Sequence, residues 1–438
     1  MELLIKNVTA VTMDPQNPVV ENCFIGIDQG KICWLSEKEP EEKAGRVVDG
    51  QGCAAMSGLV NAHTHLPMTL LRGYADDYAL QEWLQDHIFP AEGRLDARCV
   101  QAGMMLGLAE SIRFGTTSVT EMYFKMPTMA EVCFQAGIKA NLCNGAMCFD
   151  PASYDFHKAG ETLEMEEMLK SWHMADEGRI RLDVGIHGEY TSSCPAVWEQ
   201  NAAYAQEHGL NIHLHLSETK KEQEECIARW GKTPARVLAN HGVFESRVTA
   251  AHGVWITEED MDLLAEKKAT VAHNPVSNLK LASGVAPAAR MAEKGVNVAL
   301  GTDGVASNNS HDLFEEIKLS ALLQKGIQGD PRLVPAQQAL SWATRGGAFA
   351  QGREKECGML QKGMDADLIL VDLSGVATQP VHSPVSALCY SATGREVVLT
   401  MVRGRILYEK GEFKTIDVER AMAEMKNYAL PRMTGRQV

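Results

Sequence analysis

Residues 58–65 of this 438-residue chain read GLVNAHTH, a short apolar run that ends on His63 and His65. Such a run is typical of a buried β-strand. Residues i and i+2 of a strand point to the same side, so both imidazoles can reach one metal ion. The stretch therefore predicts a core strand whose carboxyl end carries part of a metal site.

Seven further short apolar stretches follow along the chain, separated by helix-like segments. The eight strands that we predict are residues 58–63, 116–121, 139–144, 181–187, 210–215, 248–252, 270–274 and 296–303. The helices that we predict between them include residues 97–114, 126–136, 195–208, 220–230, 258–267 and 285–295. Strand-helix alternation repeated eight times predicts an α/β fold, a (β/α)8 TIM-like barrel.

The two ends of the chain differ from the middle in their residue pattern. Apolar and polar residues alternate there around turn signals such as Asp49-Gly50. We predict that residues 1–56 and 358–415 together build a small β-sandwich domain. Residues 57–357 would then form the barrel, and residues 416–438 a C-terminal helix with a frayed basic tail.

The composition narrows the classes of partner. With 57 acidic and 42 basic residues the formal net charge is −15, and an acidic surface repels phosphate backbones, so we expect no nucleic-acid partner and no membrane binding. The 11 cysteines contain no CxxC pair, and the N-terminus lacks the apolar core of a signal peptide. We therefore expect a cytoplasmic protein, either a monomer or a homo-oligomer.

Metal-ligating residue types recur where the later predicted strands end. They are His213, His215, His252, His273 and Asp303. Barrels of this kind carry their active sites at the carboxyl ends of the strands. Three histidines with one aspartate suit Zn²⁺, with Fe²⁺ as the second option. We predict one such ion per subunit, which would lower the pKa of a bound water toward ~7.

Other polar residues near these strand ends are candidates for catalytic or structural roles. Glu218 lies three residues beyond His215, where a carboxylate can face the metal-bound water as a general acid/base. His213 shares the strand face of His215, and we predict a hydrogen-bonded core histidine. For His273 two roles are possible: a hydrogen bond to the substrate or to the groups that surround the metal ligands, or a cap of the following turn. The acidic run at residues 161–167 is predicted to be a solvated helix face.

Five stretches together resemble the amidohydrolase superfamily, and within it the S-adenosylhomocysteine/5′-methylthioadenosine deaminases. They are GLVNAHTHLPMTLLRG (58–73), HLHLSETKKE (213–222), AAHGV (250–254), AHNPVSNLKLASG (272–284) and GTDGVASNNSHDLFEE (301–316). The resemblance covers nearly the whole chain and includes ADLILVDL at residues 366–373. It implies hydrolytic deamination of an adenine nucleoside at C6, giving ammonia and an inosine-type product.

The resemblance also implies roles for the residues in these stretches. The implied metal ligands are His63, His65, His215 and Asp303. Asp303 would in addition take a proton from the nucleophilic water, and Glu218 would move a proton to a ring nitrogen. His252 would orient the nucleophile or the developing intermediate. Trp83, Glu92 and His187 match positions around the nucleoside, with Glu92 on the ribose hydroxyls.

The chain departs from this family in two places. Members that accept S-adenosylhomocysteine clamp its carboxylate with arginines, whereas this chain has Asn144 at the first position and only Lys158 near the second. A bidentate clamp needs the guanidinium fork. Glu189 also replaces a neutral residue near the pocket. We therefore expect neutral 5′ substituents to be preferred, as in 5′-methylthioadenosine, 5′-deoxyadenosine or adenosine.

Three functions other than deamination of an adenine nucleoside are compatible with parts of the sequence. Deamination of a free base such as guanine or 8-oxoguanine would use the same metal site, but Trp83 and Glu92 favour a ribose. A triazine-type chlorohydrolase is the next alternative, and Glu218 beside His252 favours an amine leaving group, which needs a proton donor. A non-catalytic scaffold is disfavoured because the ligand set is complete.

Overall fold

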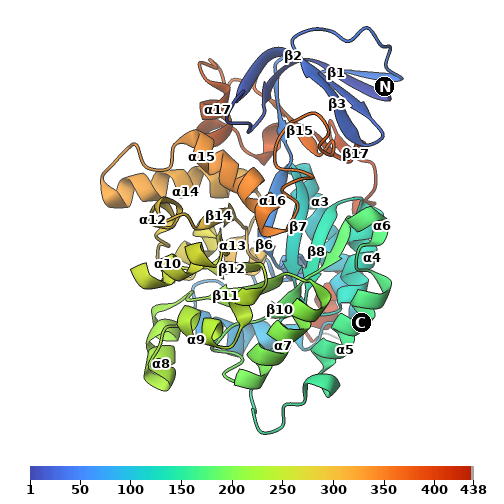
Figure 1. Cartoon of the computed structure of the whole chain (residues 1–438). Helices are drawn as coiled ribbons and strands as arrows, with labels where there is room; N and C mark the ends of the chain where they lie inside the picture. Colours follow the sequence, from blue (N-terminus) through green and yellow to red (C-terminus); the bar gives the residue numbers. More distant parts are fainter. Residues whose placement is uncertain (436–438) are drawn as a thin grey trace.

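The computed structural model describes residues 1–435, whose centre is a barrel of parallel strands (Figure 1). The barrel strands are β6 (Leu59–Thr64), β7 (Thr116–Met122), β8 (Lys139–Cys143), β9 (Ile180–Leu182), β10 (Val184–Ile186), β11 (Ile212–Leu216), β12 (Val248–His252), β13 (Thr270–His273) and β14 (Asn297–Leu300). Hydrogen bonds order them as β6-β7-β8-β9 and β10-β11-β12-β13-β14. Single parallel bridges, Thr64 to Asp303 and Ala146 to Ile186, join the two groups. The predicted barrel is thus confirmed, with its fourth strand interrupted at Asp183.

Helices surround this barrel and begin and end at the signals that the sequence carries. The longer ones are α3 (Ala97–Arg113), α4 (Met126–Ala136), α5 (Gly160–Ser171), α7 (Pro195–His208), α8 (Lys220–Trp230), α9 (Pro234–Asn240), α10 (Glu258–Glu266) and α14 (Leu313–Gln328). Asp96 caps α3 by accepting from Cys99 N, and Thr219 caps α8 by accepting from Glu222 N. The predicted helix at 285–295 is shorter, because α12 (Ala288–Glu293) starts only after Pro287.

Short helices cross the carboxyl ends of the strands between β6 and α3. They are η1 (Leu66–Leu71), α1 (Leu80–Glu82), η2 (Trp83–Ile88) and α2 (Phe89–Glu92). Further short helices follow β13, β14 and α14, namely α11 (Pro275–Lys280), α13 (Val305–Asn308), α15 (Ala336–Ser341), η5 (Trp342–Gly346) and α16 (Gly347–Ala350). The segments η2 and α2 bring Trp83 and Glu92 over the barrel mouth.

Strands from both ends of the chain form one mixed sheet above the barrel, where blue and red segments meet in Figure 1. They are β1 (Leu3–Val11), β2 (Val19–Asp28), β3 (Lys31–Ser36), β4 (Arg46–Asp49), β5 (Cys53–Ser57), β15 (Leu368–Asp372), β16 (Val397–Val402), β17 (Arg405–Glu409) and β18 (Glu412–Phe413). The N-terminal and C-terminal parts meet where β5 pairs antiparallel with β15, with Met56 opposite Ile369. We propose the bounds given above, 1–56 with 358–415, for this domain.

A buried lysine joins the barrel to this β domain. Lys139, at the start of β8, is 1% exposed, and its Nζ lies 2.7 Å from both Asp365 Oδ2 and Asp367 Oδ2. The two carboxylates compensate the buried ammonium and raise the pKa of Lys139 despite its burial. A buried charge without partners would be costly, so these contacts specify how the two parts meet.

The C-terminal segment packs against α3. It comprises α18 (Val418–Glu424), η8 (Met425–Ala429) and α19 (Leu430–Met433). Tyr428 Oη donates to Asp96 Oδ2 at 2.7 Å, and Arg98 Nε lies 2.8 Å from Glu424 Oε2. The predicted helix is therefore present, whereas the predicted basic tail includes residues 436–438, which lie outside the described residues.

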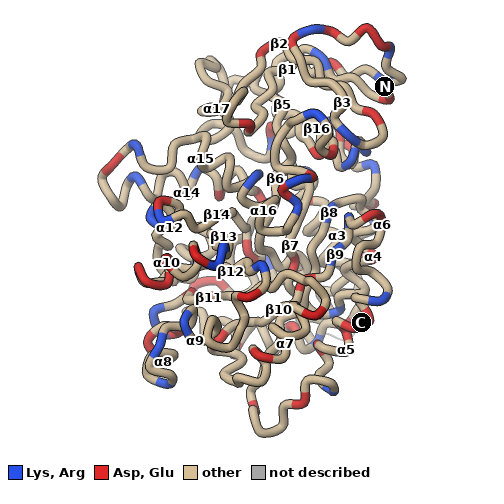
Figure 2. The backbone as a smooth tube through the Cα atoms, in the orientation of Figure 1, with Lys and Arg blue, Asp and Glu red and all other residues tan. Residues whose placement is uncertain are grey.

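Positions of basic and acidic residues are interspersed along the outer helices (Figure 2). For example, Glu258 of α10 lies 3.0 Å from Arg290 Nη2 and 2.9 Å from Lys294 Nζ. None of the helices within residues 1–435 has the length and apolar character needed to cross a membrane.

Candidate metal centre and active site

Four of the side chains predicted to bind metal converge at the carboxyl ends of β6, β11 and β14. Asp303 Oδ1 lies 3.4 Å from His63 Nε2 and 3.3 Å from His65 Nε2. His215 Nε2 lies 3.4 Å from His65 Nε2. His63 Nε2 is buried, and no described residue offers it a hydrogen bond. An orphaned imidazole nitrogen facing two histidines and a carboxylate fits a divalent metal, since burying such a group without a partner is costly.

The candidate ligand atoms form two overlapping groups within 4.8 Å. One group is His63, His65 and Asp303, and the other is His63, His215 and His252. The donor set is therefore rich in imidazole nitrogen with one carboxylate, a combination suited to zinc and to related divalent metals.

The other ring nitrogen of each candidate histidine ligand is held by a second group. His65 Nδ1 lies 2.6 Å from the carbonyl oxygen of Met122, and His215 Nδ1 contacts the carbonyl oxygen of His187. His63 Nδ1 lies 2.8 Å from His213 Nε2. These contacts leave Nε2 of each ring free for a metal, which is the usual arrangement around metal-binding histidines. The prediction of His213 as a hydrogen-bonded core histidine is confirmed.

Two serines that sequence reasoning missed hold the fourth candidate ligand, Asp303. Ser277 Oγ donates to Asp303 Oδ2 at 2.6 Å, and Ser307 Oγ donates to the same oxygen at 2.9 Å. The other oxygen, Oδ1, is the one that faces His63 and His65. The backbone of Asp303 is left-handed, with φ of 57°, and so is that of His252, with φ of 75°. Such strain in non-glycine residues is found mainly at functional sites.

Glu218 and His252 face each other beside the metal ligands. Glu218 Oε2 lies 3.8 Å from His252 Nε2, and the side chain of Glu218 is 3% exposed. Burial raises the pKa of the Glu218 carboxyl above its ordinary value. His252 Nδ1 lies 2.8 Å from Asn278 Oδ1 and 3.4 Å from Asn274 Nδ2, so the two amides orient this ring with Nε2 toward Glu218.

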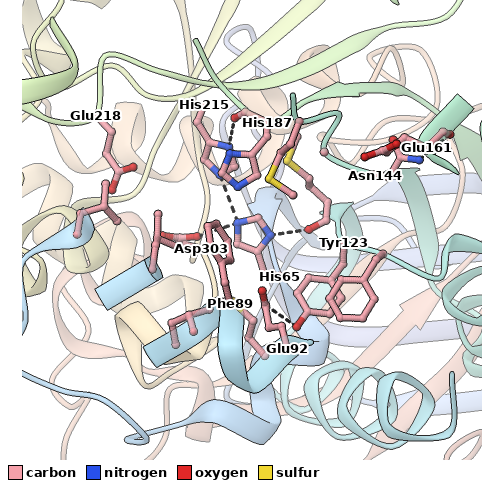
Figure 3. A pocket seen from close by; sticks show the side chains of 18 of the residues that line it. His65, Phe89, Glu92, Tyr123, Asn144, Glu161, His187, His215, Glu218 and Asp303 are labelled. Carbon is pink, nitrogen blue, oxygen red and sulfur yellow. Dashed lines mark hydrogen bonds and ion pairs between the residues drawn. The ribbon is translucent and has the colours of Figure 1, made fainter. Parts of the chain in front are cut away.

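A cavity of about 440 Å³ opens next to these groups (Figure 3). The predicted substrate residues Trp83, Glu92 and His187 line it, together with His65, His215, Glu218, His252 and Asp303. Glu92 Oε1 accepts a hydrogen bond from Tyr123 Oη at 2.6 Å. Burial raises the pKa of Glu92 to about 7, although the tyrosine bond favours its ionised form. The structure thus brings the predicted site residues to the wall of one cavity, except His63, which lies behind the wall in contact with the other candidate ligands.

Three expectations about the surroundings of the cavity need correction. Glu189 does not line the cavity: its Oε1 lies 2.6 Å from Arg229 Nη1 and 2.9 Å from Trp230 Nε1. Lys158 is exposed and pairs with Asp155 at 2.6 Å instead of approaching the site. Neither charge therefore acts on a bound substrate directly.

The third correction concerns the acidic run on α5. Glu161 and Glu164 are half-buried residues of the cavity wall, next to Asn144. Glu164 accepts from the backbone N of Met126 at 3.0 Å, which ties α5 to the start of α4. Helical spacing could have predicted their common face, but not what that face covers. His273 is buried, and it is absent from the described cavity lining.

Comparisons with known proteins agree with this geometry. A model of the amidohydrolase family matches residues 54–407. The 5-methylthioadenosine/S-adenosylhomocysteine deaminase of Thermoanaerobacter pseudethanolicus is 41% identical over 98% of this chain and 99% of its own. The 5′-deoxyadenosine deaminase of Methanosarcina acetivorans is also 41% identical, over 98% of both chains. The crystal structure of an adenosine deaminase from Xanthomonas campestris with bound zinc superposes with a TM-score of 0.92, at 34% identity over 99% of both chains.

The chain therefore belongs to the amidohydrolase family, and it is a hydrolase. The converging histidines and Asp303, together with the zinc of the structural relative, define a divalent metal site. The substrate is a small molecule, for which the cavity beside that site has room.

Proposed function

We propose that this protein is a metal-dependent aminohydrolase that converts the 6-amino group of an adenine nucleoside into a carbonyl, with release of ammonia. The observation that carries the proposal is the buried pair of Glu218 and His252, 3.8 Å apart beside the metal ligands and in the wall of a nucleoside-sized cavity. The full-length relatives named as deaminases of methylthioadenosine and deoxyadenosine support the same reaction.

Zn²⁺ is the metal that we propose, held by His63, His65, His215 and Asp303. When bound there, a divalent metal acts as a Lewis acid and lowers the pKa of a coordinated water toward ~7. Asp303 would accept the proton lost by the water that attacks C6. His252 Nε2 accepts a hydrogen bond from the attacking group, because its Nδ1 is committed to Asn278.

Glu218 carries protons between the reactants. Burial raises its pKa, which favours the protonated carboxyl that delivers a proton to a ring nitrogen as C6 becomes tetrahedral. The amino group then leaves as ammonia once protonated, and water supplies the oxygen of the product. The balanced reaction is nucleoside plus water giving the inosine-type product plus ammonia.

The ribose would lie along Glu92 and Trp83. The Glu92 carboxylate, oriented by Tyr123 Oη at 2.6 Å, can accept hydrogen bonds from two neighbouring hydroxyl groups. A free base such as guanine, or a triazine, lacks the pair of ribose hydroxyl groups that this carboxylate would bind. Leaving it unpaired in a buried site would disfavour such ligands.

For the 5′ substituent we propose 5′-methylthioadenosine, 5′-deoxyadenosine and adenosine over S-adenosylhomocysteine. Asn144 lies where a carboxylate clamp would need a guanidinium group, and Lys158 pairs with Asp155. The argument from Glu189 no longer contributes, because Arg229 neutralises it.

Ammonia release by zinc-loaded protein tests the proposal. The panel contains adenosine, 5′-deoxyadenosine, 5′-methylthioadenosine, S-adenosylhomocysteine, guanine and 8-oxoguanine. We expect turnover of the neutral nucleosides and its loss in Glu218→Gln, which removes the proton carrier but keeps the side-chain shape. Glu224→Gln, an exposed change on α8, is the matched control. Turnover of the free bases alone would contradict the assignment of Glu92 and Trp83.

A further inference from the structure

The end of the cavity farthest from Glu218 carries polar and charged side chains that the proposed reaction does not use. Asn144, Gly160, Glu161, Glu164 and Lys125 line it. In Figure 3, Asn144 and Glu161 lie on the opposite side of His65 from Glu218. A nucleoside whose C6 reaches the metal end must direct its 5′ substituent away from that end. The inference below therefore rests on the proposed function.

Asn144 presents an acceptor without a donor at this end. Its Nδ2 lies 2.9 Å from the carbonyl oxygen of Glu161 and 3.5 Å from Glu164 Oε2. Both of these are acceptors, so the amide nitrogen must face them and the amide oxygen must face elsewhere. Asn144 is 3% exposed, and its Oδ1 has no hydrogen-bond partner among the described residues. A buried acceptor of this kind is stabilised by a donor from a ligand.

The charges around Asn144 favour a cationic donor. Two carboxylates, Glu161 and Glu164, belong to this part of the wall, and Lys125 is the only lysine or arginine among the described residues that line the cavity. One positive charge therefore faces two carboxyl groups. Glu164 Oε1 is occupied by Met126 N, which leaves Oε2 turned toward Asn144.

We propose that this end of the cavity is a subsite for a primary ammonium group carried by the 5′ substituent. The ammonium has three donors, which match Asn144 Oδ1 and the carboxylates of Glu161 and Glu164. A carboxylate on the same substituent would meet like charges and an amide oxygen. The chain thus selects an aminoalkyl tail and rejects an amino-acid tail, although both carry the ammonium group.

The test uses three nucleosides that differ only at the end of the 5′ tail. They are 5′-(3-aminopropylthio)-5′-deoxyadenosine, its 5′-propylthio counterpart and S-adenosylhomocysteine, with 5′-methylthioadenosine as the reference substrate. Charge-assisted hydrogen bonds to a buried acceptor predict a kcat/KM for the amine at least about tenfold above that of the propyl compound. S-adenosylhomocysteine should fall below the amine by more than this.

Variants of α5 connect the preference to the residues. In Glu161→Gln and in Glu164→Gln the amine-to-propyl ratio of kcat/KM should fall toward one, because each glutamine keeps an acceptor but loses the charge. Glu167→Gln, an exposed change on the same helix, should keep the ratio of the unmodified protein. Because the readout is a ratio within each variant, a partial loss of folded protein does not alter it.

Two results would overturn the inference, and they differ from each other. If methylthioadenosine is deaminated but the amine-to-propyl ratio is near or below one, the ammonium subsite is wrong while the proposed function stands. If none of the nucleosides is deaminated by zinc-loaded protein, the proposed function fails and the subsite fails with it.

Discussion

His213 Nε2 lies 2.8 Å from His63 Nδ1, a contact that joins a residue near the start of β11 to one near the carboxyl end of β6. Both rings are fully buried, and burial lowers the pKa of each, so both are neutral at pH 7. Because Nδ1 of His63 faces His213, Nε2 is the ring nitrogen left for the metal.

Removing this second histidine should weaken the metal site without touching a ligand. In His213→Ala we expect metal affinity to fall by about 10–100-fold, because His63 loses the group that fixes its ring and tautomer. Competition with a chelator, followed by metal analysis, measures the effect. His241→Ala, a change on the outside of the barrel where His241 pairs with Glu199, is the control. Unchanged affinity in the His213 variant would show that packing alone orients His63.

Asn278 should affect the reaction rather than the metal. Its Oδ1 holds Nδ1 of His252 at 2.8 Å, so Asn278→Ala frees that ring to turn. We expect kcat to fall by at least about tenfold, as for other groups that orient catalytic hydrogen bonds. Metal content should stay at the unmodified level. A matching loss of metal would mean that His252 is itself a ligand.

Glu92 should make the protein less stable as the pH rises. Its pKa is about 7 in the folded chain against 4.5 when exposed, because of burial. Between these values the folded state binds more protons than the unfolded state, so stability from this group is present below pH 4.5 and is lost as the pH rises through 7. The effect amounts to at most ~3 kcal/mol above pH 7.

Thermal melts of Glu92→Gln against the unmodified protein measure this. The variant lacks the titration, so its advantage in Tm should grow from pH 5 to pH 8. Comparing both proteins with bound metal keeps the metal contribution equal. A constant difference across this range would mean that Glu92 titrates like an exposed glutamate.

Lys139 provides a test of the interface between the barrel and the β domain. Replacing it by methionine leaves Asp365 and Asp367 without the ammonium group that lies 2.7 Å from each. We expect a loss of ~3–5 kcal/mol in the free energy of unfolding, since one partner of a buried ion pair is removed. Chemical denaturation measures it, with Lys170→Met on exposed α5 as the control. The triple change with Asp365→Asn and Asp367→Asn should recover part of the loss.

The barrel and the meeting of the candidate metal ligands at its rim could be predicted from local sequence because two simple rules apply to them. Side chains two apart on a strand share a face, which pairs His63 with His65. Parallel strands of a barrel then end on one rim, which brings His215 and Asp303 to that pair although they lie far along the chain. Neither step requires knowledge of how a particular helix packs.

The surroundings of the site could not be predicted in this way. Glu189 is adjacent to the pocket residue Tyr190 in sequence, yet its carboxylate turns outward to Arg229 on α8. Asn144 stands where relatives that bind S-adenosylhomocysteine have a clamping arginine. The ligand that it can bind depends on Glu161 and Glu164, which reach it only because α5 packs beside the end of β8.

The sequence by itself thus predicted the eight-stranded barrel from its repeated strand-helix alternation and placed His63, His65, His215 and Asp303 at one rim of it, and the family resemblance selected these four as candidate metal ligands. The tertiary structure decided which nitrogen of His63 is free, where Glu189 points and what charge lines the far end of the cavity. Those features depend on contacts between segments that no local pattern relates, and on the need of each buried polar group to find a partner.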